Sequence, residues 1–312
     1  MSILNVDIIA SQSTGDVTVN DPLKVDLIQN SSGAYYNSVN VNGVPLIGDE
    51  TAGFIRVGQS SNNNLNLTHS VCIGSNMNQA SGVNWGGGIA IGNSCLNQAK
   101  DLSSNIAIGY GCMGTTQNAS ITDCAKSNIA IGISAGSNLT GVGPSGDDGS
   151  FNVILGRFAG TTLTSGSNNI VIGNSANTAT ATASDTITLG NNQIFALRCN
   201  VQTITSLSDA RDKKEVTELP IGLDFINGLK PVTFVWDERG EDGKKDIKDF
   251  GFIAQDLKKS QEDAKLAETL KLVYEENPEK LEASYGKLIP ILVKAIQEMS
   301  SEIKLLKEEL LN

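Results

Sequence analysis

The stretch Asn105-Ile106-Ala107-Ile108-Gly109 contains the unit that decides the fold of the first two thirds of this chain. The same motif, a short run of mainly β-branched residues followed by glycine, recurs along the chain. Its copies end at Gly74, Gly92, Gly109, Gly132, Gly156, Gly173 and Gly190. Successive glycines are 18, 17, 23, 24, 17 and 17 residues apart, so two units carry insertions. A repeat of this period predicts a stacked β-solenoid.

Each unit has a simple physical interpretation. Alternation in a strand puts Ile106 and Ile108 on one face and Ala107 on the other. Gly109 permits a positive φ at the turn. A small residue stands three positions after five of these glycines, namely Cys95, Cys112, Ala135, Ala159 and Ala176. One unit cannot bury its apolar face alone, and a single thin stack has a poor core, which favours several chains sharing one.

The cysteines and the single histidine point away from metal chemistry. The chain has five cysteines and no CxxC pair, so we expect no disulfide framework, no zinc site and no cofactor. Cys95 and Cys112 share a repeat phase and read as small buried apolar groups, with a redox or metal role as the alternative. His69 precedes a repeat strand and reads as a turn residue.

Charge divides the chain near residue 207. Residues 1–207 hold 17 charged side chains, whereas residues 208–312 hold 40. The net charge of −11 argues against nucleic acid as the main partner. No apolar run is long enough for a transmembrane helix and the first twenty residues lack a secretory pattern, so we expect no membrane insertion.

The repeat resembles the head repeats of trimeric autotransporter adhesins and the repeats of many phage tail fibres, over roughly residues 65–195. That resemblance implies a homotrimer with a parallel β-roll or β-prism shaft, whereas the spacing by itself predicts only a solenoid. Upstream, short apolar runs at Val25–Ile28, Val39–Val41 and Phe54–Val57 are bounded by turn residues and predict short strands. The position of residues 1–64 before the shaft suits a virion-attachment region.

After residue 207 the pattern predicts a mixed α+β domain. Apolar positions 223, 226 and 229 predict a short amphipathic helix within Leu219–Leu229. Pro231–Trp236 reads as a strand, Asp237–Asp249 as a polar hairpin loop, and Phe250–Leu257 as a strand running into a helix.

The last helix carries the clearest periodicity. Apolar residues spaced alternately four and three apart form a heptad seam, which predicts a coiled coil over about 285–311 and is compatible with a trimer. The seam consists of Tyr285, Ile289, Leu292, Ile296, Met299, Ile303, Leu306 and Leu310.

The ordered motifs of residues 208–312 resemble the intramolecular chaperone and self-cleaving domain of phage tail fibres and tailspikes. The resemblance rests on Ser208–Lys213 (Ser-Asp-x-Arg-x-Lys), the Pro-x-x-Phe-x-Trp strand, Gly-Phe-Ile-Ala-Gln-Asp and the terminal coiled coil. It implies a domain that trimerises the chain and cuts itself off at Leu207–Ser208. Ser208 would be the nucleophile and Lys213 the base of a serine endopeptidase with no external substrate, and Asp209 and Arg211 belong to the motif.

These observations predict a mostly β protein with three regions: 1–64, a solenoid shaft over 65–207, and a chaperone domain over 208–312. We expect a trimeric phage tail fibre, assembled in the host cytoplasm and residing in the virion. Its partners would be tail or baseplate proteins and a host cell-surface receptor, with the insertions near 113–127 and 137–150 as candidate contact loops. The alternatives are a chaperone domain retained without cleavage, a bacterial trimeric surface adhesin, and a polysaccharide-degrading tailspike.

Overall fold

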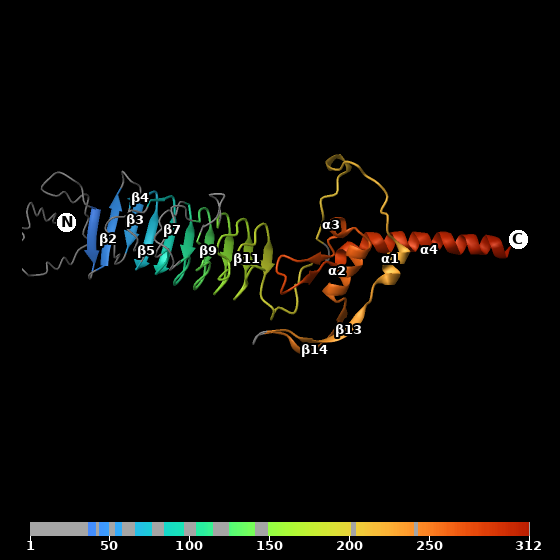
Figure 1. Cartoon of the computed structure of the whole chain (residues 1–312). Coiled ribbons are helices and arrows are strands. Elements are labelled where there is room, and N and C mark those ends of the chain that lie inside the picture. Colours follow the sequence, from blue (N-terminus) through green and yellow to red (C-terminus); the bar gives the residue numbers. More distant parts are fainter. Residues whose placement is uncertain are drawn as a thin grey trace, which may run out of the picture.

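The computed structural model is a β-solenoid followed by an α+β domain that ends in a long helix (Figure 1). This confirms the predicted fold class. The structure describes residues 37–41, 44–49, 54–57, 66–76, 84–96, 104–114, 125–140, 149–200, 204–239 and 243–311. The predicted strand at Val25–Ile28 and most of both insertions lie outside these ranges.

One ladder of strands runs the length of the solenoid. It opens as an antiparallel meander of β1 (Asn37–Val41), β2 (Val44–Asp49) and β3 (Phe54–Val57). From β3 onward the pairing is parallel, through β5 (Val71–Ser75), β7 (Ile89–Asn93), β8 (Ile106–Ile108), β9 (Ile129–Ile131), β10 (Val153–Leu155), β11 (Ile170–Ile172) and β12 (Ile187–Leu189). A short parallel pair, β4 (Asn66–Thr68) and β6 (Asn84–Gly86), lies beside it.

The register of this ladder follows the repeat phase. Ile106 pairs with Ile129 across an interval of 23 residues, and Ile129 pairs with Val153 across 24. Ile170 pairs with Ile187 across 17. The insertions therefore leave the pairing of the strands unchanged and are accommodated between them.

The core of the solenoid is built from the middle residues of the strands and from buried residues of the turns, among them Cys112, Ala135 and Leu163. Ala107, Ala130, Ile154 and Val171 are fully buried. The isoleucines on either side of them point out of the coil and are only partly covered, with Ile131 40% exposed. The narrow coil thus takes mainly small side chains inside and leaves a ladder of β-branched side chains on its outer face.

The repeated glycine is required by the close approach of neighbouring coils. Gly109 has a φ of +136°, and a Cβ there would collide with the carbonyl oxygen of Gly132 in the next coil. Gly132 stands in the same relation to Gly156. Any side chain at this position would push the coils apart.

A ladder of buried asparagines runs through the solenoid just before the strands. Asn105, Asn128, Asn152 and Asn169 are all 0% exposed. Each Oδ1 accepts the backbone N–H of the equivalent residue in the following coil, for example Asn169 N to Asn152 Oδ1 at 3.0 Å. Thr186 ends the series, because its N and Oγ1 donate to Asn169 Oδ1.

The C-terminal domain begins with the 3₁₀ turn η1 (Ala210–Asp212). Its further elements are α1 (Leu223–Gly228), β13 (Val232–Asp237), β14 (Lys245–Gly251), α2 (Ala254–Asp263), α3 (Ala267–Leu270), β15 (Val273–Tyr274), β16 (Glu282–Ala283), η2 (Tyr285–Lys287) and α4 (Leu288–Leu310). The predicted helix, the Pro-x-x-Phe-x-Trp strand and the final helix are confirmed. The polar loop expected over Asp237–Asp249 is wrong in extent, since β14 begins at Lys245. The strand β14 has the largely polar sequence KDIKDFG and is exposed except at Gly251. Its sequence therefore lacks the alternation of apolar and polar residues that would have predicted a strand.

The long helix α4 presents two apolar faces. Leu288, Ile291 and Ala295 are buried on the side that packs with α1. The heptad seam lies exposed, with Ile289 62%, Ile296 60% and Ile303 52% accessible. Figure 1 shows α4 extending beyond α1 at the end of the molecule. Among the described residues, no helix combines the length and apolar character that crossing a membrane needs.

Candidate functional site

The segment that links the solenoid to α1 brings Ser208 and Lys213 together. Lys213 Nζ donates to Ser208 Oγ at 2.6 Å and to the Ser208 carbonyl oxygen at 3.2 Å. The two side chains are five residues apart and meet because η1 reverses the chain between them. The resemblance predicted these residues as nucleophile and base, and the structure places their polar atoms in direct contact.

Asp209 and Arg211 hold the turn between them. Asp209 caps η1, because its Oδ1 accepts the backbone N–H of Arg211 at 2.9 Å. The Arg211 guanidinium binds the same carboxylate through Nε to Oδ1 at 3.0 Å and through Nη2 to Oδ2 at 2.6 Å. These hydrogen bonds lower the pKa of the Asp209 carboxyl and raise the pKa of Arg211.

The bond that precedes Ser208 is open to solvent. Leu207 is fully exposed, and residues 204–218 around it are also exposed. Figure 1 shows this stretch as the gold loop that projects from the body of the C-terminal domain. A hydroxyl beside an amine, next to an exposed peptide bond, can support proton transfer and acyl transfer at Leu207–Ser208.

The segment that contains Ser208 and Lys213 matches a known protein family. Residues 208–266 match the family described as Chaperone of endosialidase. The match begins at Ser208 and runs through Lys213, α1, the β13–β14 hairpin and α2. The chain therefore combines a β-solenoid with a segment, residues 208–266, that is similar to this family. No curated protein and no solved structure matches the chain.

Within this chaperone-like domain, the Gly-Phe-Ile-Ala-Gln-Asp motif docks on Tyr285. The Tyr285 hydroxyl accepts the backbone N–H of Phe252 at 3.0 Å and donates to its carbonyl at 3.3 Å. The two rings meet edge to face at 5.6 Å. A Cβ on Gly251 would press on the Tyr285 hydroxyl, so a side chain there would displace the tyrosine from this contact. The heptad pattern had marked Tyr285 only as a seam residue and did not predict this anchoring contact.

A second contact that the sequence did not predict joins α1 to α4. Glu298 Oε2 accepts the backbone N–H of Leu223 at 2.6 Å, so a carboxylate from α4 satisfies the N-terminus of α1. Gly222 leaves the room that this carboxylate occupies. No local pattern signals such a cap, because the two residues are 75 positions apart.

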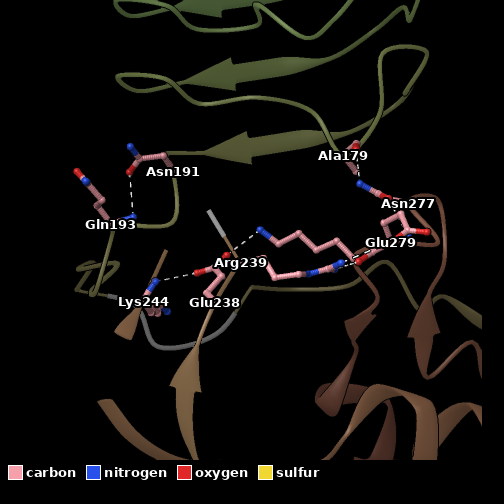
Figure 2. A network of polar contacts seen from close by, with 9 residues as sticks. Ala179, Asn191, Gln193, Glu238, Arg239, Lys244, Asn277 and Glu279 are labelled. Atoms are coloured by element: carbon pink, nitrogen blue, oxygen red, sulfur yellow. Dashed lines mark hydrogen bonds and ion pairs between the residues drawn. The ribbon is translucent and has the colours of Figure 1, made fainter. Parts of the chain in front are cut away.

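A polar junction connects the domain to the last coil of the solenoid (Figure 2). Asn277, in the loop between β15 and β16, donates through Nδ2 to the Ala179 carbonyl at 3.0 Å. Thr180 Oγ1, next to Ala179 in the coil, donates to Oε1 of Glu276, which precedes Asn277 in the loop, at 3.5 Å. Figure 2 also shows Arg239 reaching the carbonyl of Glu279, which ties the β13–β14 hairpin to the same loop.

The buried cysteines behave as small apolar groups with hydrogen-bonding thiols. Cys95 donates to the Gly109 carbonyl at 2.6 Å, and Cys112 donates to the Ala130 carbonyl at 3.0 Å. Burial raises the pKa of both thiols, that of Cys112 to about 12. His69 has a φ of 53° in the turn before β5, as predicted. In the described ranges, no cluster of three or more His, Cys, Asp or Glu side chains could hold a metal ion.

Proposed function

We propose that this chain is a subunit of a homotrimeric phage tail fibre, whose C-terminal domain directs folding of the trimer and then cuts the Leu207–Ser208 bond. The solenoid would form the shaft that persists in the virion. The N-terminal region would attach to tail or baseplate proteins, and loops of the shaft would contact a host cell-surface receptor. Assembly would take place in the host cytoplasm.

The observation that carries this proposal is apolar surface left open on two independent elements. On the solenoid, the outward isoleucines of successive strands form a continuous ladder, and exposure rises to 68% at Ile187. On α4, the heptad seam is exposed although the adjacent face of the helix, with Leu288, Ile291 and Ala295, is packed. Ladders of this kind are energetically unfavourable in water, and threefold association would bury both of them.

Exposed apolar residues also line the segment between these elements. Phe195 is 89% exposed, Leu197 73% and Ile204 97%. Exposed apolar residues therefore occur on the described parts of the segment between the shaft and the domain as well. Three copies side by side would cover these residues.

A shaft of near-identical coils needs help to assemble. Its strands repeat the same sequence motif many times, so a chain can pair with its neighbour one coil out of register. Non-local parallel pairing is slow, and unpaired edges aggregate. A helical domain that trimerises through the α4 seam would align three chains at one end and raise their local concentration. This role agrees with the description of the family that residues 208–266 match.

The cleavage step follows from the contact between Ser208 and Lys213. Neutral Lys213 takes the proton of the Ser208 hydroxyl, and Oγ attacks the carbonyl carbon of Leu207. The bond from that carbon to the Ser208 nitrogen breaks, and the nitrogen takes up the proton. Water then hydrolyses the ester, which leaves a carboxylate on Leu207 and an amine on Ser208. The shaft is thereby separated from the domain that assembled it.

The test compares the full wild-type chain with Ser208→Ala and Lys213→Ala on a denaturing gel. Lys214→Ala, an exposed neighbouring lysine, is the matched control. We expect fragments of 207 and 105 residues from the wild type and the control, and intact chains from the two dyad variants. A wild-type chain that stays intact overturns the cleavage, and a monomer in light scattering overturns the shared-core trimer.

The polar junction favours a second arrangement, in which the domain stays bound. Asn277 and Glu276 contact the last coil through Ala179 and Thr180. These contacts do not depend on the Leu207–Ser208 bond and would survive its cleavage. Co-elution of the 105-residue fragment with the shaft in gel filtration would support this alternative, and separate elution would exclude it.

A further inference from the structure

We infer that Arg211 is a positioning residue for the Ser208–Lys213 pair: it occupies the carboxylate of Asp209 and so leaves the Lys213 amine to Ser208. This inference rests on the proposed self-cleavage and deepens it. Arg211 belongs to the Ser-Asp-x-Arg-x-Lys motif, but the motif by itself gives it no role.

The geometry of the turn sets the choice between two partners for Lys213. Asp209 adjoins the nucleophile and lies four residues before the lysine, within the same reversal of the chain. Both oxygens of Asp209 are taken by the Arg211 guanidinium, at 3.0 and 2.6 Å. Lys213 Nζ instead bonds the hydroxyl and the carbonyl of Ser208. Among the described residues, the ion pair of Asp209 is with Arg211, not with Lys213.

The other charges near the pair lie on the same exposed segment. They are Asp212, Lys214 and Glu215, and the nearby Glu218 is paired with Lys294 of α4 at 3.4 Å. No charged side chain from another element is in contact with Lys213 in the described structure. Of these carboxylates, Asp209 is the one that adjoins the nucleophile and is paired with Arg211. The lowered pKa of Asp209 agrees with a carboxylate held in its ionised form by Arg211.

Loss of Arg211 would change the partner of Lys213. An unpaired Asp209 carboxylate would attract the lysine as an ammonium ion and stabilise its charged form. A charged lysine cannot take the Ser208 proton, so cleavage would slow and would need a higher pH. We expect a rate reduction of about two- to fivefold at neutral pH and a pH profile displaced to higher pH, because charges that are exposed to water interact weakly.

The experiment measures the rate of appearance of the 105-residue fragment between pH 6 and 9, in four full-length proteins. These are the wild type, Arg211→Ala, the double variant Asp209→Asn with Arg211→Ala, and Arg198→Ala. Arg198 is an exposed arginine ten residues before the nucleophile and controls for the lost charge. The asparagine of the double variant keeps an oxygen to cap η1 and removes the competing charge.

The expected result is slow cleavage with a raised pH midpoint for Arg211→Ala, and a midpoint restored towards that of the wild type in the double variant. If Arg211 only stiffened the turn, the double variant would remain as slow as Arg211→Ala and its midpoint would not return. That outcome, or an Arg211→Ala profile equal to that of the wild type, overturns the inference. A wild-type chain that never cleaves overturns the proposed cleavage instead, so the two failures are distinguishable.

Discussion

Asn128 Oδ1 accepts two hydrogen bonds from Asn152 in the next coil, from the backbone N–H at 2.8 Å and from Nδ2 at 3.1 Å. Asn128 makes the same pair of donations to Asn105. Each amide thus links the coil before it to the coil after it. Because these groups are fully buried, a coil that slipped by one position would leave them unsatisfied.

This relationship predicts a large effect for Asn128→Ala. The substitution removes the acceptor for two buried N–H donors of Asn152, and an unsatisfied buried donor costs about 1–3 kcal/mol. We expect a lower thermal midpoint for the full-length protein. Asn138→Ala is the control, since Asn138 is exposed and donates one bond to Thr161. Equal midpoints for the two variants would refute a structural role for the ladder.

The close approach of the repeated glycines predicts that a side chain at this position disrupts the shaft. Gly132→Ala places a Cβ against the carbonyl of Gly156 at a φ of +140°, so strain and collision act together. We expect loss of ordered shaft, measured as a fall in β-structure by circular dichroism and as aggregation. Gly286→Ala is the matched control, because a Cβ there meets no atom within 4 Å. A Gly132→Ala protein with a wild-type spectrum would contradict this account of the packing.

The exposed seam of α4 predicts how the trimer is lost. In the uncleaved Ser208→Ala background, adding Ile296→Asp puts a charge into the centre of the seam. We expect light scattering to change from the mass of three chains to that of one chain of 32.8 kDa. Ser301→Asp adds the same charge on the face opposite the seam and should leave the mass unchanged. A trimer that survives Ile296→Asp would show that the α4 seam is not required to hold the three chains together.

The raised pKa of Cys112 predicts a pH dependence of stability. Below pH 9.0, the ordinary value for a thiol, this group is protonated in both the folded and the unfolded chain. Above it the unfolded chain loses the proton, whereas the folded thiol keeps it up to about pH 12. The stability is therefore present below pH 9 and is lost as pH rises towards 12, by about 1 kcal/mol per chain from pH 9 to 10.

Chemical denaturation at pH 8, 9 and 10 measures this loss. Cys112→Ala should lose less stability over the same range, because alanine has no thiol to ionise. The substitution should also fit the core, since Ala135 and Ala159 fill the equivalent position in other coils. The exposed Cys199 serves as the control, and Cys199→Ala should follow the wild type. The thiol explanation would be refuted if Cys112→Ala lost stability as steeply as the wild type.

Much of the fold could be predicted because its signals are periodic. The spacing of the glycines predicted a stacked solenoid in which two units carry insertions, and the heptads predicted α4. The hairpin was predicted with a loop that is too long, because polar β14 carries no alternation. In the site, the motif resemblance predicted that Ser208 and Lys213 act together, whereas the Glu298 cap on α1 had no local signal.

The amino-acid sequence by itself determined the solenoid, its register and the change to a charged helical domain near residue 207. Repeats and heptads are local patterns, and local backbone geometry follows from them. Only the tertiary structure decided which face of each strand is inside. Ala107 and Ile106 are both apolar, and the middle residue faces inwards in β10 and β11 as well, where it is the larger Ile154 or Val171. The turn at the glycine that follows each strand, with its positive φ, sets the direction of the strand and so decides the face. The tertiary structure likewise decided that Arg211 pairs with Asp209 and that Lys213 meets Ser208, because that choice depends on the turn between them.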